Sequence, residues 1–279
     1  MVAMKNGLIG EKLGHSLSPQ IHQIIFKELG VHNSYELIEL PPEEVLPFLA
    51  TADKEYSGLN VTIPYKVAVT EGLKATSREA TSIGAVNTIQ FKNNAGFGFN
   101  TDYFGFGRML DHNKISLKGK KVVMLGNGGA AKAVLQAIID RQAGEILVVA
   151  RNVQLAKEKL HNFVVRTKNL NFVDYQTFNR MPQGDVMINT TPVGMFPKVD
   201  AAAVPAEVMQ GYEAAVDIVY NPLETKFLAQ AKAAGCKTCN GIYMLVAQAV
   251  AAEEIWLDRK LPDTLIEKVE TELREEVIS

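Results

Sequence analysis

Short apolar runs alternate with helical patterns over the first third of the chain. Apolar runs at 7–10, 35–40 and 59–63 have the composition of half-buried or buried strands. Each is followed by a segment whose apolar residues recur at helical spacing, and these segments are 18–29, 43–52 and 65–72. This repeat of strand and helix predicts an α/β domain with a largely parallel sheet.

Two asparagines indicate a hairpin in this domain. Asn93 and Asn94 separate apolar runs at 85–91 and 96–100, and Asn tolerates the left-handed backbone that a tight hairpin turn requires. A helix predicted over 103–113 then leads into the second half of the chain.

The second half continues the alternation of strands and helices. Its predicted strands lie near 121–125, 146–150, 185–189, 215–219 and 236–239. The helices predicted at 243–256 and 263–277 have no strand after them, so we expect them to return to the first domain. We therefore predict one domain from 1–103 with 242–279, a second domain from 104–241, and a cleft between the two.

Residues 121–152 combine a strand, a glycine-rich turn, a helix and a second strand in the order of dinucleotide-binding folds. Gly126 permits the tight turn, Gly128 lets the backbone approach a phosphate, and Ala131 lets the helix pack closely on the sheet. Free N–H groups at the start of the helix then face the anion. The pattern predicts a Rossmann-like, doubly wound domain that binds a pyrophosphate.

The residues after the second of these strands bear on which dinucleotide binds. An NAD site usually has an acidic residue here for the ribose 2′-hydroxyl, whereas this chain has Ala150 and Arg151. Because an Arg accommodates a 2′-phosphate, NADP is predicted over NAD. The alternative is an exposed Arg that follows an ordinary strand.

Composition narrows the class of protein. The chain has 279 residues, 47% of them hydrophobic and 22% charged, which is ordinary for a globular protein of two domains. Its net charge of -2 provides no broad basic surface, so nucleic acid and anionic membranes are not expected partners. There is no long apolar run, and the first residues lack the apolar core of a signal peptide, so a cytoplasmic location is expected.

Cysteines and histidines do not suggest a metal. Cys236 and Cys239 are spaced as in a redox pair or half a zinc site, but no further ligands have matching spacing. They are expected on a short strand, as small semi-buried residues. The five His residues, at positions 15, 22, 32, 112 and 161, also lack ligand spacing, and no metal is predicted.

Polar residues cluster at predicted strand ends and helix starts of the first domain, where α/β sheets bind ligands. The clusters are 15–19, 60–66, 85–88 and 98–102. Each has an ordinary explanation: Ser18 and Asp102 can cap helices, Lys66 can be exposed, and Asn87 can serve a turn. Together they offer hydroxyls for a carboxylate or polyol, amides for alcohol groups, and a Lys and an Asp able to handle a proton.

At these residues the chain closely resembles the shikimate dehydrogenase family, nearly from end to end. The matching motifs are SLSP at 16–19, NVTIPYK at 60–66, AVNT at 85–88, NTD at 100–102, GNGGAA at 126–131, NTTPVGM at 189–195, DIVYNP at 217–222 and NGIYMLVAQA at 240–249. The resemblance implies NADP-linked interconversion of shikimate and 3-dehydroshikimate, a step toward chorismate and the aromatic amino acids. It also implies that the first domain binds substrate and the second binds NADP.

Residue roles follow from the same resemblance. Lys66 and Asp102 match the catalytic pair, and Ser16 and Ser18 match the serines that hold the substrate carboxylate. The matches to residues that hold the substrate hydroxyls are Asn60, Thr62, Asn87, Asp102 and Gln248, with Lys66 beside them and Tyr220 at the cleft. The expected cofactor contacts are Gly126, Asn127, Gly128, Gly129, Ala130, Ala131, Arg151, Asn152, Thr190 and Thr191, with Gly241 and Met244 beside the nicotinamide.

The chain departs from the family pattern at a few positions. Ala150 replaces the Asn of a usual Asn-Arg-Thr, and Leu155 replaces a frequent second basic residue, which weakens the expected NADP preference. Gln23 replaces a usual Asn and Glu253 a common aromatic, and both are expected to affect packing more than chemistry.

Three alternatives stay open at this point. The first is an NAD-preferring relative that accepts quinate as well as shikimate, and the second is another two-domain NAD(P) dehydrogenase. The third, from a different class, is a catalytically silent module that binds a nucleotide or metabolite, although the presence of both Lys66 and Asp102 weighs against it. The expected ligand is a small molecule in every case, and a monomer and a homodimer are both compatible with the sequence.

Overall fold

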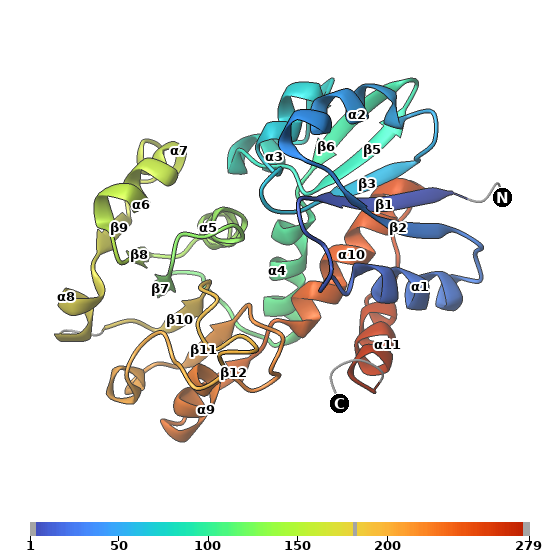
Figure 1. Cartoon of the computed structure of the whole chain (residues 1–279). Helices are drawn as coiled ribbons and strands as arrows, with labels where there is room; N and C mark the ends of the chain where they lie inside the picture. Colours follow the sequence, from blue (N-terminus) through green and yellow to red (C-terminus); the bar gives the residue numbers. More distant parts are fainter. Residues whose placement is uncertain (1–3, 181–182, 276–279) are drawn as a thin grey trace. The chain divides into compact units, whose positions relative to one another are not determined.

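The computed structural model describes residues 4–180 and 183–275 (Figure 1). They divide into two compact units. One unit takes the described residues up to Gly105 and those from Val246 onward, and the other takes Phe106–Leu245. The chain passes from one unit to the other twice, each time within a long helix. These helices are α4 (Thr101–His112) and α10 (Ile242–Leu257).

The first unit is built on a six-stranded sheet with the order β2-β1-β3-β5-β6-β4. Its strands are β1 (Lys5–Gly10), β2 (Ser34–Glu39), β3 (Gly58–Val61), β4 (Ala75–Thr76), β5 (Thr88–Lys92) and β6 (Ala95–Phe99). Three of the five strand pairs are parallel, and β5 runs antiparallel to both of its neighbours. The sheet is mixed rather than largely parallel, because the β5–β6 hairpin is inserted beside β3.

The hairpin turn has the backbone that its sequence predicts. Asn93 and Asn94 have φ angles of 51° and 57°, the left-handed values of a type I′ turn. The predicted helix over 65–72 is wrong, since only Ala68–Gly72 forms a short 3-10 helix. Within 65–72 only Tyr65 and Val69 are buried, which is too little apolar contact to stabilise a longer helix.

Helices cover both faces of this sheet. The helices of the unit are α1 (Ser18–Leu29), α2 (Val45–Ala52), α3 (Arg78–Ile83) and α11 (Asp263–Leu273), with parts of α4 and α10. Residues of α2 and α3 pack with Ile9 and Leu59 on one face, and α1 and α10 pack with Leu8 on the other (Figure 1). Trp256 of α10 lies so close to β3 that a Cβ on Gly58 would fall 2.0 Å from its indole nitrogen.

The last helix packs on α1 and ends earlier than predicted. Lys27 Nζ lies 2.6 Å from Glu272 Oε1, and Lys268 Nζ lies 3.1 Å from Glu28 Oε2, so ion pairs join α1 and α11. The helix predicted over 263–277 ends at Leu273, and residues 276–277 lie outside the described residues.

The second unit contains a fully parallel sheet with the order β12-β11-β10-β7-β8-β9. Its strands are β7 (Lys121–Leu125), β8 (Glu145–Val149), β9 (Leu170–Val173), β10 (Val186–Asn189), β11 (Ala214–Asp217) and β12 (Lys237–Cys239). The helices are α5 (Ala131–Asp140), α6 (Val153–Lys159), α7 (His161–Val164), α8 (Tyr175–Arg180) and α9 (Lys226–Ala233). The order of strands reverses between β7 and β10, which makes the predicted doubly wound arrangement.

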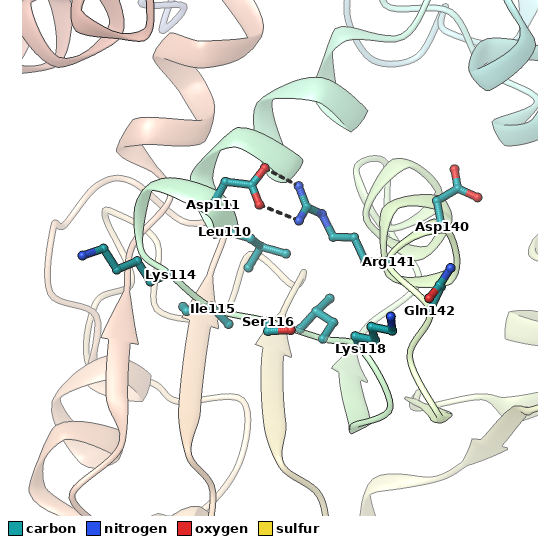
Figure 2. A pocket seen from close by; sticks show the side chains of 10 residues that line it. Leu110, Asp111, Lys114, Ile115, Ser116, Lys118, Asp140, Arg141 and Gln142 are labelled. Atoms are coloured by element: carbon teal, nitrogen blue, oxygen red, sulfur yellow. Dashed lines mark hydrogen bonds and ion pairs between the residues drawn. The ribbon is translucent and has the colours of Figure 1, made fainter.

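Arg141 joins α4 to the end of α5 within the second unit. Its guanidinium donates to both carboxylate oxygens of Asp111 at 2.7 Å and to the carbonyl oxygen of Gly107 at 2.7 Å. The pair lies at a shallow pocket of about 510 Å³ between the two helices (Figure 2). Because the most strongly basic group of this pocket is engaged by two residues of α4, we assign Arg141 a structural role.

No helix within 4–180 or 183–275 has the length and apolar character needed to cross a membrane.

Candidate active site

Lys66 and Asp102 are in contact in the first unit. Lys66 Nζ lies 2.6 Å from Asp102 Oδ2, and the two side chains are 19% and 14% exposed. Lys66 lies in the turn after β3, and Asp102 lies in the first turn of α4. An ammonium and a carboxylate that touch each other and remain partly open to solvent can exchange a proton with a bound molecule.

Asn87 holds the other oxygen of this carboxylate. Its Nδ2 donates to Asp102 Oδ1 at 2.9 Å. Its Oδ1 accepts from the backbone N–H of Thr101 at 2.6 Å, and this bond fixes which way the amide points. Asp102 therefore has a partner at each carboxylate oxygen, and the partner at Oδ1, Asn87, is 3% exposed and directly precedes β5.

Asn60 lies beside this group and is 6% exposed. Its Nδ2 donates to the carbonyl oxygen of Asn87 at 3.3 Å and to Thr88 Oγ1 at 3.1 Å. The hydroxyl of Tyr35 donates to Asn60 Oδ1 at 2.7 Å. Both amide protons of Asn60 are therefore used within the protein, and a ligand can bind only as a donor to Oδ1.

Ser16 and Ser18 lie together at the start of α1 and are half-buried. Ser16 Oγ donates to Ser18 Oγ at 3.2 Å. The N-cap of α1 is Leu17, and no side chain caps it, so the ordinary explanation of Ser18 as a helix cap is wrong. The two hydroxyls are thus available to a ligand at this end of α1.

The remaining predicted substrate contacts are distributed over both units. Thr62 directly follows β3 and is half-buried. Gln248 of α10 lies with its Oε1 3.5 Å from Thr101 Oγ1, at the start of the helix that carries Asp102. Tyr220 follows β11 in the second unit, where burial raises the pKa of its hydroxyl.

A pocket of about 600 Å³ lies in the second unit at the carboxyl ends of β7, β8 and β10. Parallel α/β sheets bind ligands at this edge, where the strand order reverses. The predicted cofactor residues that line the pocket are Gly126, Asn127, Gly128, Arg151, Thr190 and Thr191. Three polar residues that the sequence reasoning missed also line it: Lys159, Tyr175 and Asn179.

The glycine turn fits a pyrophosphate. Gly126 has a φ of 96°, and a Cβ there would lie 2.6 Å from Thr191 Cγ2, so the tight turn requires glycine. At Gly128 an added Cβ would meet only the carbonyl oxygen of Thr190, 3.9 Å away, so the backbone faces open space. No side chain caps the start of α5 at Ala130. The N–H of Ala131 donates to the carbonyl oxygen of Gly128 at 3.2 Å, and the N–H groups that follow it in the first turn can face an anion.

The other predicted cofactor residues do not line this pocket; they are Gly129, Ala130, Ala131, Asn152, Gly241 and Met244. Ala131, the first residue of α5, is fully buried. Asn152 Oδ1 accepts from the N–H of Leu155 at 3.0 Å, which caps α6. A Cβ on Gly241 would fall 2.1 Å from the carbonyl oxygen of Ile218, so only glycine fits there.

A buried polar network positions the loop after β10. Asn189 Oδ1 accepts from Thr191 Oγ1 at 2.7 Å, and Asn189 Nδ2 donates to Asp217 Oδ1 at 3.0 Å. Thr225 Oγ1 donates to Asp217 Oδ2 at 2.7 Å. Burial raises the pKa of Asp217 from 3.8 to about 6. The hydrogen bonds that Asp217 accepts from Thr225, the backbone N–H of Val219 and Asn189 oppose this rise.

This shift predicts a stability that depends on pH. Because the folded-state pKa of about 6 lies above the unfolded value of 3.8, the folded state binds more protons between these pH values. Asp217 therefore destabilises the fold progressively as the pH rises through this window, by about 3 kcal/mol in all. An Asp217→Asn variant lacks this titration and keeps an oxygen for Asn189.

Urea unfolding of both proteins at several pH values checks this. The free energy of unfolding of the variant minus that of the wild type should increase as the pH rises. The increase should level off above pH 6, which is about the folded-state pKa of Asp217. The constant effect of the substitution cancels in this comparison. A difference that does not change with pH would contradict the prediction.

Among the described residues, no group of three or more His, Cys, Asp or Glu side chains is arranged to hold a metal ion. Cys236 and Cys239 are both buried and are not joined in a disulfide, and Cys239 lies on β12 with Cys236 immediately before it.

Comparisons with known proteins agree with this arrangement. Two family models match the chain: the shikimate dehydrogenase substrate binding domain over residues 8–89, and shikimate / quinate 5-dehydrogenase over residues 109–218. A shikimate dehydrogenase (NADP(+)) of Clostridium perfringens is 43% identical over 274 residues, which cover 96% of this chain and 97% of the relative.

Solved structures give the same result. A chorismate mutase/shikimate 5-dehydrogenase fusion protein from Clostridium acetobutylicum has a TM-score of 0.92 at 42% identity, with 100% of both chains covered. The shikimate 5-dehydrogenase from Thermus thermophilus, in complex with NADP(H) and shikimate, has a TM-score of 0.86 at 33% identity, with 96% of this chain and 99% of that chain covered. This chain therefore belongs to the shikimate dehydrogenase family.

Proposed function

We infer that this chain catalyses the reversible reduction of 3-dehydroshikimate to shikimate with NADP as cofactor, a step of aromatic amino acid biosynthesis. The observation that carries this inference is the contact between Lys66 and Asp102. The curated relatives of this chain are named as NADP-dependent shikimate dehydrogenases. When bound, NADP(H) supplies or accepts the hydride. The protein has to bind and orient the substrate and to move one proton.

Lys66 is our proposed proton donor and acceptor. In reduction the hydride goes to the carbonyl carbon and a proton from Lys66 Nζ goes to the carbonyl oxygen; in oxidation the neutral amine takes that proton back. Asp102 Oδ2, 2.6 Å away, orients the ammonium and stabilises its charge. Asn87 keeps Asp102 in place through its 2.9 Å hydrogen bond.

The substrate contacts that we propose lie around this pair. The hydroxyls of Ser16 and Ser18 suit a carboxylate, to which each can donate one hydrogen bond once Ser16 turns its O–H from Ser18 to the ligand. The proposed contacts to the ring hydroxyls are Asn60, Thr62, Asn87, Asp102 and Gln248. Asn60 acts there as an acceptor, because its two amide protons are already used. Tyr220, which belongs to the second unit, stays a predicted contact.

Arg151 and Lys159 are our proposed ligands for the 2′-phosphate of NADP. Both line the nucleotide pocket. Lys159 is one helical turn beyond Leu155 on α6 and so shares its face of the helix. Lys159 thereby supplies the second positive charge that is missing at position 155, where the chain has a leucine.

Substitutions of these two residues should change cofactor preference. Arg151→Ala is expected to lower kcat/KM for NADP by about 10- to 100-fold, the value of one charge-assisted hydrogen bond. Lys159→Ala should have a smaller effect of the same kind, and kcat/KM for NAD should hardly change in either variant. Lys157→Ala is the matched control, since Lys157 is exposed on the same helix but does not line the pocket. An equal loss with both cofactors would contradict the assignment.

An assay that crosses NADP and NAD with shikimate and quinate tests the function itself. We expect the fastest cofactor reduction with NADP and shikimate. The NAD-preferring quinate alternative is not favoured, because the curated relatives carry NADP in their names. Faster turnover with NAD and quinate would establish that alternative, and no turnover with any pair would overturn the proposed function.

We further propose that the enzyme acts in the cytoplasm as a monomer or homodimer. That Cys236 and Cys239 are not joined in a disulfide suits a reducing compartment. Analytical ultracentrifugation of the purified protein would distinguish the two oligomeric states.

A further inference from the structure

The first unit contains a second pair of ionisable side chains, separate from Lys66 and Asp102. His22 of α1 and Glu253 of α10 are 1% and 0% exposed, and His22 Nδ1 lies 2.7 Å from Glu253 Oε1. The pair adjoins an apolar cluster that includes Phe26 and Trp256. His22 Nε2 and Glu253 Oε2 have no hydrogen-bond partner among the described residues.

Such a pair is a costly way to fill a core. Burying ionisable groups is unfavourable unless their hydrogen bonds are satisfied, and apolar side chains of similar size are often at least as stabilising. Good packing alone therefore does not explain His22 and Glu253. Their contacts with neighbouring residues offer an explanation.

The imidazole of His22 stacks on the ring of Tyr35. The ring centroids are 4.0 Å apart and the planes differ by 11°. Because Nδ1 is bound to Glu253, the imidazole plane is fixed, and the stacked phenol ring is confined with it. Tyr35, on β2, is itself 9% exposed.

The hydroxyl of Tyr35 fixes one of the proposed substrate contacts. It donates to Asn60 Oδ1 at 2.7 Å, and this bond orients the amide of Asn60. Burial raises the pKa of Tyr35 well above its ordinary value, so the hydroxyl keeps its proton and remains a donor.

We propose that Tyr35, held in place by the His22–Glu253 pair, is a positioning residue that sets the orientation of Asn60 before the substrate binds. The proposal rests on the function proposed above. Side chains that are already oriented lose less conformational freedom on binding. This benefit is equal for substrate and transition state, so its loss should raise KM for shikimate and leave kcat nearly unchanged.

Tyr35→Phe tests the proposal, because it removes one oxygen and preserves the ring. KM for shikimate should rise about 3- to 10-fold, the worth of one neutral hydrogen bond, with kcat and KM for NADP within about twofold. Tyr56→Phe is the matched control. Tyr56 is 7% exposed in the same unit, and its hydroxyl donates to Glu36 rather than to a substrate contact. Equal KM values for the two variants would overturn the proposal.

Two substitutions of Glu253 test the role of the pair. Glu253→Gln keeps an acceptor for His22 and should keep KM near the wild-type value, whereas Glu253→Leu removes it and should raise KM as Tyr35→Phe does. The double variant Tyr35→Phe/Glu253→Leu should be no worse than either single variant, because both act through one hydroxyl. Effects on KM that multiply would refute this coupling. A purely structural pair would lower the melting temperature of Glu253→Leu without changing KM.

Failure of this inference and failure of the proposed function give different results. If the wild-type protein does not oxidise shikimate with NADP, the proposed function is wrong and no KM exists to compare. If the wild type is active and Tyr35→Phe matches Tyr56→Phe, only the positioning role is wrong. Measurement of each melting temperature confirms that the variants are folded at the assay temperature.

Discussion

Replacing Lys66 with Ala is expected to lower kcat by about 100- to 10,000-fold, the usual contribution of general acid–base catalysis. KM for shikimate should change far less, since the other proposed contacts remain. Asp102 keeps its 2.9 Å bond from Asn87 in this variant, so the carboxylate is not left without a partner. Steady-state kinetics in both directions measure the effect.

Two further substitutions sharpen this test. Lys66→Arg retains the positive charge but cannot release a proton near neutral pH, so it should remain as slow as Lys66→Ala if Lys66 transfers a proton. Lys92→Ala removes another lysine paired with an aspartate in the same unit, 3.2 Å from Asp258, and should have wild-type kinetics. Recovery of activity in Lys66→Arg would reduce Lys66 to a charged substrate ligand, and near-normal turnover of Lys66→Ala would exclude it from catalysis.

Gly128→Val is expected to weaken NADP binding by at least about 100-fold, which corresponds to about 2.8 kcal/mol. The open space beside Gly128 is where the pyrophosphate should pass, and a branched side chain there displaces it from the free N–H groups of α5. The fold should be unaffected, because a Cβ at Gly128 meets only an oxygen 3.9 Å away. Isothermal titration with NADP and thermal unfolding measure the two properties separately.

Gly126→Ala should mainly reduce the stability of the fold, whereas Gly128→Val should mainly reduce the affinity for NADP. With a φ of 96° and Thr191 Cγ2 only 2.6 Å from the added Cβ, alanine strains the turn and should lower the melting temperature. Backbone strain of this kind costs about 1–3 kcal/mol. Gly128→Ala, with its smaller side chain, should bind NADP with an affinity between those of wild type and Gly128→Val. Normal NADP affinity in Gly128→Val would place the pyrophosphate elsewhere.

Much of the fold could be predicted because its signals are local. The predicted and observed bounds of α1 are the same, since Pro19 lies in its first turn and Gly30, with a φ of 63°, ends it. Strand β7 also has its predicted bounds, because a short run of buried apolar residues before a glycine turn is recognisable in sequence.

The elements that were missed are short or lie at an edge. Strand β9, at the edge of the sheet, has four residues that are only partly buried, so it lacks a clear apolar pattern. Helix α3 is different, because its signals were present: Ser77 accepts from the N–H of Ala80, and Gly84 ends the helix with a φ of 69°. Attention to these caps would have found it.

The candidate site could be predicted only as a set of separate motifs. The glycine turn, the polar ends of the strands and the Arg after β8 could be recognised from sequence, since each depends on neighbouring residues and their spacing. It did not indicate Tyr35 as a partner of Asn60 or Lys159 as a partner of Arg151, because an aromatic on a strand and a lysine on a helix are commonplace.

Which of these side chains meet depends on how the whole chain folds. Lys66 and Asp102 are 36 positions apart, and His22 and Glu253 are 231 positions apart, yet the paired atoms lie only 2.6 Å and 2.7 Å from each other. Such contacts depend on the order of strands in the sheet and on which helix covers which face. These features come from burial of apolar surface shared across the whole unit, and no local stretch of sequence carries them.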